Sequence, residues 1–505
     1  GPNAFSGVVN IITGNRSPNK ICASLLLGQY GLSGTSANIS NTSAKLEQFL
    51  SLSRTVSEGY IENIDFTIGS LFYQAQYKLK QGTLDLQTGY GLKNFGANSF
   101  YSLKYPDQFE SVKTEFVSIR YRNRSAIRIE PAVYVRRNRD RFELKRDDES
   151  VPFNHHRTLT AGLNINAWTV HRFGRTSLGA DLRNEHILSN VLGNMLTSPV
   201  EVRGFEDTYY LKSYNRFNTS FYAEQAFSRG RFMGTMGVMA HHNPDLSWFR
   251  FYPGIDFSYR FNDYFRIYSS MNKTLRMPTF TDMFYTSPVQ QGNQHLKPEE
   301  AITLEAGIKY GSALVNGDIN AFCRRGYNLI DWVKDPSPDS LTWRSANHAN
   351  VIFTGFEASL GITPSGENPD GRLQALRASY SFLSADQAEG EMLSRYALDY
   401  LKHQVNFSID FRIAGKLYNS TRVTWRDRNG TWQNTSGEVI SYEPFWLSDT
   451  RFIWKEQHIS VYLEASNIFN SGYYDFGGLI QPGIWIRGGI SMNLHYMKGK
   501  PGTKN

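Results

Sequence analysis

Four carboxylates lie close together in the segment from Tyr134 to Arg157, YVRRNRDRFELKRDDESVPFNHHR. They are Asp140, Asp147, Asp148 and Glu149. Clustered carboxylates on a flexible loop suit Ca²⁺, a hard cation that prefers oxygen ligands. Their spacing is not that of an EF-hand loop, and a solvated acidic loop tip is the alternative. The sequence therefore indicates a candidate calcium site and no firm cofactor.

Histidines in or near predicted loops could ligate haem iron, because imidazole is a common axial ligand. They are His155, His156, His241, His242 and His295. Loop histidines that hold no metal are the alternative interpretation.

Aromatic side chains at predicted loop tips are better general candidates for a binding site. Large amphipathic ligands are held by aromatic faces and a few polar anchors. The aromatic candidates are Phe284, Tyr285, Trp343, Trp432, Tyr473, Tyr474 and Phe476, and the polar candidates are Gln290, Asn293, His295 and Arg344. Membership of an aromatic girdle at a membrane interface is the alternative for each ring.

Catalytic motifs are missing from the sequence. There is no Gly-x-Ser-x-Gly, His-Glu-x-x-His or P-loop element. The cysteines, Cys22 and Cys323, fall on predicted strands far apart in the chain, where we interpret them as small hydrophobic residues rather than a disulfide or metal pair. We therefore expect that the protein is not an enzyme.

The elements that must position these residues are stretches of alternating apolar and polar side chains. In the last stretch Ile486, Ile490 and Leu494 share one face, while Arg487 and Asn493 share the other. Successive side chains of a strand point to opposite faces, so one face is apolar and the other polar. Charge on the second face indicates a watery interior.

The connectors between these stretches alternate in length. Tight links such as 80–81 and 262–263 are followed by long ones such as 138–157 and 328–350. Outer-membrane barrels have short periplasmic turns and long extracellular loops, whereas a soluble β-sandwich has no reason to keep that order. Counting about 22 stretches, the sequence predicts an all-β fold, a 22-stranded antiparallel transmembrane β-barrel with short periplasmic turns and long extracellular loops.

Composition agrees with a barrel. Mean hydropathy is −0.44 and there is no run of about 18 apolar residues, which excludes membrane-spanning helices. The net charge of +8 is spread along the chain, with a local basic cluster at Arg136, Arg137, Arg139 and Arg141. This cluster could contact lipopolysaccharide or an anionic ligand, and a solvated loop is the alternative. We expect no nucleic-acid partner.

The segment from Leu275 to Glu305, LRMPTFTDMFYTSPVQQGNQHLKPEEAITLE, resembles a region of TonB-dependent outer-membrane receptors. There a strand with an Arg and a Pro enters an extracellular loop and returns through a Gly-Asn, Leu-Lys-Pro-Glu signature. The matching residues are Arg276, Pro278, Gly292, Asn293, Leu296, Lys297, Pro298, Glu299 and Glu305. Proline cannot donate to a strand ladder, so we expect Pro278 and Pro298 to bracket the loop, and Glu305 to face the lumen.

Both ends of the chain add to this resemblance. Residues 1–14, GPNAFSGVVNIITG, look like the last strand of the family's plug domain, residues 15–497 form the predicted barrel, and residues 498–505 are a polar tail. Tyr462 to Tyr496 is similar to the family's last hairpin, although the tail departs from the usual aromatic end. The resemblance implies a TonB box and most of the plug upstream of Gly1, and therefore a TonB complex reached through that absent region.

The resemblance implies a multi-pass protein of the bacterial outer membrane that actively imports a large, scarce ligand. Residues 134–157 and 180–186 (ADLRNEH) are similar to cobalamin-receptor-like members from Bacteroidetes, which points to cobalamin (vitamin B12) or a related corrinoid. A ferric siderophore or haem is the alternative, although haem receptors of the family usually carry a His where Thr279 to Gln291 has none. A passive pore made by the plug-depleted barrel is an alternative of another class. Outer-membrane lipid, lipopolysaccharide and a surface lipoprotein are the further expected partners.

Overall fold

The computed structural model describes residues 5, 7, 9, 19–244, 246, 248–335, 342–364, 371–387, 393–394, 399–475 and 477–495. Over these residues, 22 long strands form one closed antiparallel barrel, as the alternating sequence predicted. Each strand pairs with the next one along the chain, and β1 pairs with β28 to close the cylinder. Closure leaves no strand edge unpaired, which is the condition for crossing a bilayer with strands.

The barrel strands of the first half are β1 (Lys20–Gly28), β2 (Ser33–Thr42), β3 (Leu46–Ser57), β4 (Phe66–Leu79), β5 (Gly82–Gly96), β6 (Phe109–Asn123), β7 (Arg128–Glu143), β8 (Asn154–His171), β9 (Gly174–Ser189), β11 (Tyr209–Arg229) and β12 (Phe232–His242). Those of the second half are β13 (Arg250–Arg260), β14 (Phe265–Arg276), β17 (Glu299–Gly311), β18 (Val315–Lys334), β19 (Trp343–Ile362), β20 (Leu373–Gln387), β22 (Tyr400–Ala414), β23 (Leu417–Asn429), β26 (Phe445–Lys455), β27 (Ile459–Ser466) and β28 (Trp485–His495).

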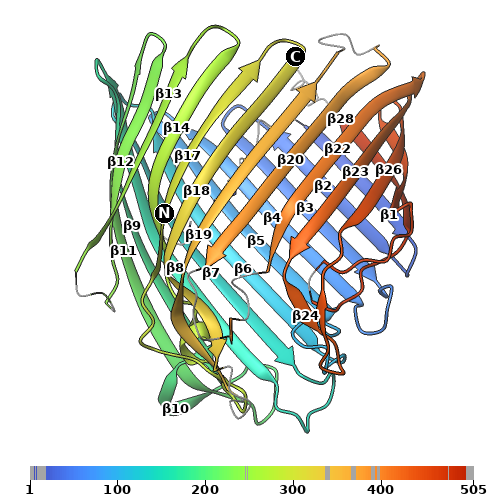
Figure 1. Cartoon of the computed structure of the whole chain (residues 1–505). Helices are drawn as coiled ribbons and strands as arrows, with labels where there is room; N and C mark the ends of the chain where they lie inside the picture. The colour runs from blue at the N-terminus through green and yellow to red at the C-terminus, as the bar shows by residue number, and fades with distance from the viewer. Residues whose placement is uncertain are drawn as a thin grey trace, which may run out of the picture.

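Short elements occupy the long connections. They are β10 (Asn194–Glu201), α1 (Phe280–Phe284), β15 (Thr286–Ser287), β16 (Gln290–Gln291), β21 (Leu393–Ser394), β24 (Thr431–Gln433) and β25 (Val439–Ser441). Figure 1 shows them gathered at one end of the barrel, the loop end, while tight turns join the strands at the other, the turn end. In outer-membrane barrels the tight turns face the periplasm, so the loop end is extracellular.

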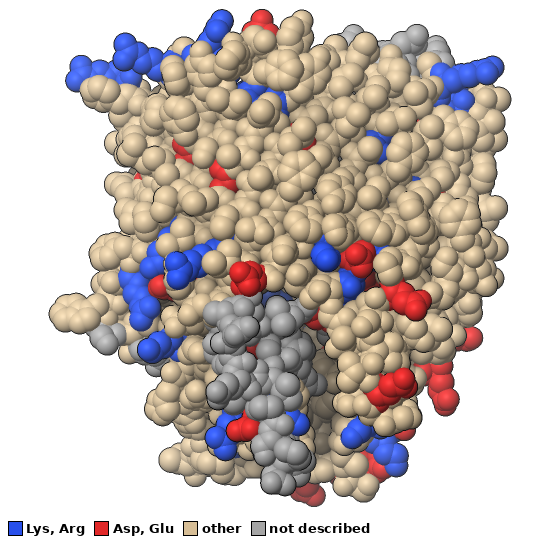
Figure 2. All heavy atoms as spheres, viewed as in Figure 1, with Lys and Arg blue, Asp and Glu red and all other residues tan. Residues whose placement is uncertain are grey.

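The two faces of the wall differ as the alternation predicted. Leu71, Ile255 and Ile490 are exposed on the outside, and Figure 2 shows a band with few charges between a charged rim and the charged loop half. On the inside of β4 and β5, the Asp85 carboxylate accepts hydrogen bonds from Gln74, at 2.5 Å, and from Gln76, at 2.7 Å. Apolar atoms thus meet lipid, and a polar network lines the lumen.

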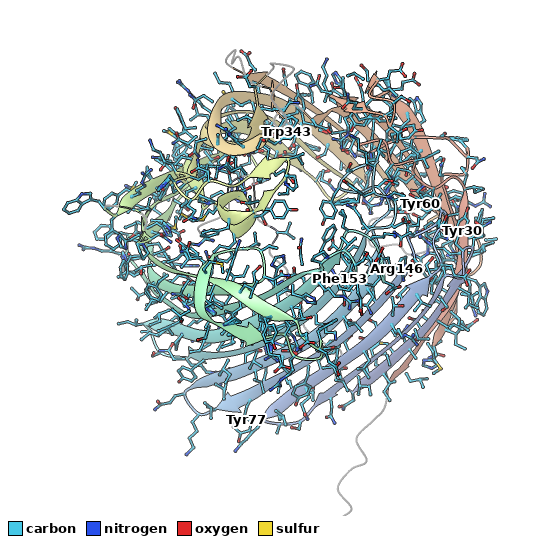
Figure 3. The ribbon with its side chains drawn as sticks, turned by 90° about the horizontal axis from the view of Figure 1, so that it is seen from below. Tyr30, Tyr60, Tyr77, Arg146, Phe153 and Trp343 are labelled. Carbon is cyan, nitrogen blue, oxygen red and sulfur yellow. The ribbon has the colours of Figure 1, made fainter. Side chains whose placement is uncertain are left out.

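Aromatic rings gather near the turn end, where the belt meets water. Phe232 and Tyr259 lie 4.6 Å apart between ring centroids, and Phe265 and Tyr310 lie 4.9 Å apart. Figure 3, a view into the loop end, shows Tyr77 on the outside of the barrel. Such amphipathic rings sit at the headgroup level, which explains part of the aromatic excess.

Some predicted loops are strands, and this corrects the sequence interpretation. Half of the predicted connector 138–157 belongs to the ends of β7 and β8, and most of 328–350 belongs to β18 and β19. The basic cluster from Arg136 to Arg141 therefore lies on β7 and not in a solvated loop. Beyond the bilayer both faces of a strand meet water, so apolar alternation ends although the hydrogen-bonded ladder continues.

The ends of the chain are described only in part. Of the proposed plug remnant, residues 1–14, the structure describes Phe5, Gly7 and Val9, and the Phe5 carbonyl accepts a hydrogen bond from Thr274 Oγ1 at 3.5 Å. The polar tail, 498–505, lies outside the described residues. No helix in the described residues is long and apolar enough to cross a membrane. Cys22 on β1 and Cys323 on β18 are free thiols.

Candidate functional site

The connection between β14 and β17, residues 277–298, is the mouth loop. It begins with Pro278 after β14 and ends with Pro298 before β17, so the prolines bracket it as predicted. Thr279 and Asp282 form a capping box, with Thr279 Oγ1 accepting from the Asp282 amide at 3.0 Å and the Asp282 carboxylate accepting from the Thr279 amide at 3.1 Å. This reciprocal pair satisfies the exposed amides that begin α1.

Arg216 fastens the start of the mouth loop to the inner wall. It is buried, its Nη1 donates to the Pro278 carbonyl at 2.7 Å, and its Nη2 lies 2.7 Å from a Glu185 carboxylate oxygen. The guanidinium also lies 4.9 Å from the centroid of the Phe280 ring. One side chain from β11 therefore joins an acid on β9 to the backbone of the loop.

Phe284 is part of this attachment and not a free aromatic face. It is 6 % exposed and packs with Ile187, Leu192 and Met283, with Tyr285 at the edge of the cluster. The ring is therefore buried where the sequence suggested an exposed loop tip, and contact of Phe284 with a ligand stays a prediction. An aromatic residue on a loop was expected to be exposed, but the loop folds back onto the barrel wall and buries it.

The signature residues at the other end of the mouth loop also hold the frame. Arg276 forms an ion pair with Glu299, whose second oxygen accepts from the Ile330 amide at 2.7 Å. A Cβ at Gly292 would lie 2.9 Å from the Met283 backbone, so the close approach requires glycine. The Asn293 amide donates to the Asp282 carbonyl at 3.0 Å. The remaining signature positions are Leu296 and Lys297, in the last part of the loop, and Glu305, on β17.

Three candidate residues meet at a pairing that sequence spacing did not indicate. β16 runs parallel to the start of β19, with Gln290 opposite Trp343 and Gln291 opposite Arg344. His295 is exposed, and its amide donates to the Asn293 side chain at 2.9 Å. Figure 3 places Trp343 at the loop end of the barrel. Gln290, Trp343 and Arg344 thus form one group beside the mouth loop.

A second group of candidates, the tyrosine cluster, lies between β23 and β28. Its rings are Trp432 and Tyr474, 5.2 Å apart, and Phe445 and Tyr473, 4.6 Å apart. Phe476 belongs to the same connection but lies outside the described residues. The cluster therefore presents several rings from two loops close together.

Ion pairs surround the tyrosine cluster. Arg426 lies 3.1 Å from Asp475, and Arg428 lies 2.5 Å from Asp399, between nitrogen and oxygen atoms. The Tyr442 hydroxyl donates to the same Asp399 at 3.2 Å. Phe407 on β22 is exposed on the outside of the barrel and lies opposite Val423 on β23. Both arginines are an odd number of residues beyond Val423, so alternation places them on the inner face of β23. The mouth therefore combines aromatic faces with charged anchors.

The predicted metal ligands are not brought together. Asp140 lies on β7, Asp148 bonds to Lys145 and Ser150, and Asp147 is exposed. Among the described residues, no three His, Cys, Asp or Glu side chains are placed to share an ion. Calcium and haem-iron ligation by the candidate residues therefore remain predictions. Glu149 follows Asp148 in the connection between β7 and β8, whereas His241 and His242 lie on β12, where His241 Nδ1 lies 3.0 Å from Ser220 Oγ.

Three side chains at the loop end of β7 and β8 have strongly shifted pKa values, namely His155, His156 and Asp140. Burial first, and then nearby charge, lowers the pKa of each histidine to about 4. Burial first, and then Glu110, raises the pKa of Asp140 to about 6. His156 Nδ1 lies 2.8 Å from Ser189 Oγ. All three groups are therefore largely held in their neutral forms in mildly acidic solution.

These shifts predict opposite effects of two substitutions on acid stability. As the pH falls from 6.5 to 4, the histidines of the unfolded chain take up protons before those of the folded chain, so the free energy of unfolding decreases. As the pH falls from 6 to 3.8, Asp140 takes up its proton first in the folded state, so the free energy of unfolding increases. His156→Asn should therefore shrink the loss of apparent melting temperature between about pH 7.5 and about pH 4.5, and Asp140→Asn should enlarge it. Thermal melts in detergent at both pH values measure this, and two changes of the same sign would contradict it.

Comparison with known proteins agrees with this geometry. Residues 27–468 match the family model described as TonB dependent receptor-like, beta-barrel. The chain belongs to the TonB-dependent receptor β-barrel family. This receptor is therefore an outer-membrane protein of a family of receptors and transporters and not of enzymes. The resemblance to TonB-dependent receptors is thereby confirmed.

Individual relatives show how far the likeness extends. A 96-residue segment is 31% identical to the vitamin B12 transporter BtuB of Vibrio vulnificus, covering 19% of this chain and 15% of that protein. The FrpB iron transporter of Neisseria meningitidis is similar in structure, with a TM-score of 0.76 and 14% identity over 95% of this chain and 82% of that one. The siderophore receptor PirA of Acinetobacter baumannii gives 0.75 and 14% over 98% and 83%. At such identities the solved structures show the fold alone.

Sequence reasoning missed several residues of the site. Arg216 and Glu185, which fasten the mouth loop, and Arg426 and Arg428, which flank the tyrosine cluster, were not candidates. A signal was present, because each is a charged residue on the inner face of a strand near its loop end. Which loop would meet these charges could not be read from the spacing of residues.

Proposed function

We propose that this receptor imports cobalamin or a related corrinoid across the outer membrane, with TonB delivering the energy for transport. The observation that supports this ligand is the 96-residue segment that is 31% identical to a vitamin B12 transporter. Family membership over residues 27–468 supports import through the barrel. The polar lumen and the aromatic loop end are the physical features that such an import needs.

The tyrosine cluster suits a ligand of this chemistry. A corrinoid is a large, partly apolar macrocycle rimmed by amide arms, so it needs flat apolar contacts and several hydrogen-bonding groups. Tyr473, Tyr474 and Trp432 supply ring faces. Arg426 and Arg428, partnered by Asp475 and Asp399, supply fixed polar anchors. Import of a ferric siderophore is the second candidate, because the same anchors are cationic.

The ligand is tested by titrating the purified receptor in detergent with cyanocobalamin, haem and a panel of ferric siderophores. Saturable binding of cyanocobalamin alone supports the proposal. Binding of a siderophore without cobalamin would replace it, and a steady conductance in a planar bilayer without ligand binding would favour a passive pore. Uptake of labelled cobalamin by cells with and without TonB then tests the energy source.

A substitution in the tyrosine cluster should weaken this binding. Tyr473→Ala removes a ring that lies against Phe445, and we expect about a tenfold rise in Kd, the equivalent of about 1.4 kcal/mol. Tyr77→Ala is the matched control, because Tyr77 is on the outside of the barrel. Isothermal titration measures both, and equal Kd values for the two variants would remove the tyrosine cluster from the site.

A further inference from the structure

Three residues of the basic cluster on β7, Arg137, Arg139 and Arg141, lie on the outer face of the barrel, whereas Arg136 lies on the inner face. Val117 on β6 is opposite Val135 on β7, and these side chains are 47% and 43% exposed toward lipid. The register continues without a shift, so the partners Lys113 and Arg139 share that outward face. Arg157 on β8, opposite Arg139, shares it too.

The height of the cluster matches the headgroup layer. Arg139 is four residues beyond Val135 on the same strand, which is about 13 Å along the strand and about 9 Å in height for a strand tilted by about 45°. The polar layer of a bilayer begins where the hydrocarbon ends and is about 5–8 Å thick on each side. Measured from Val135, Arg137 therefore lies within this layer and Arg139 at its outer edge.

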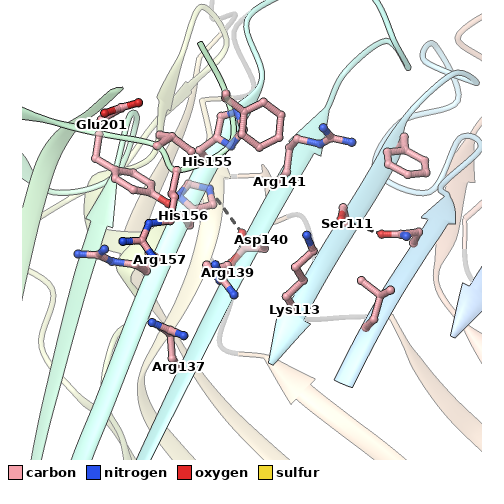
Figure 4. Close-up of a pocket in the computed structure, with 17 residues that line it drawn as sticks. Ser111, Lys113, Arg137, Arg139, Asp140, Arg141, His155, His156, Arg157 and Glu201 are labelled. Atoms are coloured by element: carbon pink, nitrogen blue, oxygen red, sulfur yellow. Dashed lines mark hydrogen bonds and ion pairs between the residues drawn. The ribbon is translucent and has the colours of Figure 1, made fainter. Parts of the chain in front are cut away.

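A cavity of about 680 Å³ lies over these residues. Figure 4 shows Lys113, Arg137, Arg139, Arg141 and Arg157 side by side along its floor. The connection between β10 and β11 and the start of β11 cover it, with the Phe205 ring centroid 5.2 Å from the Arg141 guanidinium and the Tyr210 ring centroid 5.7 Å from that of Arg157. The site is thus roofed by a loop and rooted in rigid strands.

Its positive charge is only partly neutralised. Glu115 pairs with Arg137 and Arg139, and Glu143 pairs with Arg141. In the described part of the chain, Lys113 and Arg157 have no carboxylate partner, and neither has Arg203 on the covering loop. The buried Nε atoms of Arg139 and Arg141 also lack an acceptor. Unsatisfied donors of this kind favour an anion with several oxygens.

We propose that this outer cavity binds a phosphate group of lipid A, the membrane anchor of lipopolysaccharide in the outer leaflet. The belt below supplies the apolar surface for the acyl chains, as at Val117 and Val135. The guanidinium groups match phosphate geometry, because planar forks bind two oxygens at once. The cations of the site lie on the face opposite to the lumen, so the proposed site does not depend on the imported cargo.

The test uses the purified, delipidated receptor in detergent and two matched double variants. Lys113→Gln with Arg157→Gln removes two cations from the outer face, whereas Arg120→Gln with Arg136→Gln removes two from the inner face of β6 and β7. Both pairs change the net charge equally, and all four positions lie outside the proposed cobalamin contacts. Binding is measured with bis-phosphorylated lipid A, dephosphorylated lipid A and inorganic phosphate.

We expect lipid A with its phosphates to bind, and the outer double variant to raise its Kd by about tenfold or more while the inner one leaves it unchanged. Dephosphorylated lipid A should bind the native receptor about as weakly as lipid A binds the outer variant. Equal effects of the two double variants, equal binding of dephosphorylated lipid A, or equally tight binding of inorganic phosphate would each overturn the proposal. Cobalamin binding by the outer variant should not change, which separates this test from that of the proposed function.

Discussion

Arg216→Ala should release the mouth loop from the barrel wall and cost about 3–5 kcal/mol of local stability. The side chain is 7 % exposed and joins Glu185 to the Pro278 carbonyl. Its removal leaves the Pro278 carbonyl without this donor and leaves the Glu185 carboxylate with Arg183, at 3.2 Å, and the Asn218 side chain, at 3.4 Å. Breaking one partner of a buried pair is costly because the other remains desolvated.

Limited proteolysis of the folded receptor measures this release as new cleavage within residues 277–298. Arg266→Ala, an exposed inner-face position near the turn end, is the control and should leave the loop protected. Removing both partners, with Glu185→Ala and Arg216→Ala together, should cost less than the sum of the two single changes. Unchanged protection in Arg216→Ala would show that Phe284 and its neighbours hold the loop without the ion pair.

Ile255→Arg should destabilise the barrel by about 2–4 kcal/mol, whereas Asp256→Arg should be tolerated. Ile255 is 48% exposed on the lipid face, opposite Met236 and Met271, and Asp256 is the next residue, on the lumen face. Near the middle of the belt an arginine has no water to solvate it, while a lumen arginine remains hydrated.

The comparison of these neighbours is made by urea titration of the barrel in lipid vesicles. The two variants differ by one position along a single strand, and the larger change in net charge belongs to Asp256→Arg, the variant that should be tolerated, so charge alone does not explain the expected difference. Equal stabilities would mean that both faces of β13 meet similar solvent, and the assignment of lumen and lipid faces would fail.

The sequence predicted the fold well because a barrel repeats one physical rule. Every strand must alternate, as Ile490 and Ser491 do, and every second connection must be short. It predicted the loop end less well. The rule ends at the membrane surface, so the ends of β7 and β8 beyond it were predicted as loop. For the same reason the sequence did not show on which face of the barrel Arg139 lies.

The site was predicted in part for a related reason. Residue type identified the rings of Tyr473 and Trp432, which lie near one another. It misjudged Phe284, because whether a loop aromatic is exposed depends on the surface against which the loop folds. It also missed Arg216, whose acceptor is a backbone carbonyl 62 residues away in the chain.

The clamp of Arg276 and Glu299, with Gly292 and Asn293 between them, braces the loop through contacts within the protein itself. Selection for a different ligand can therefore change the rings around Tyr473 while the clamp is retained. Selection for folding can retain the clamp in relatives that import different ligands. The residues by which the family is recognised therefore do not indicate the ligand. A survey of specificity within this family should group proteins by the rings around Tyr473.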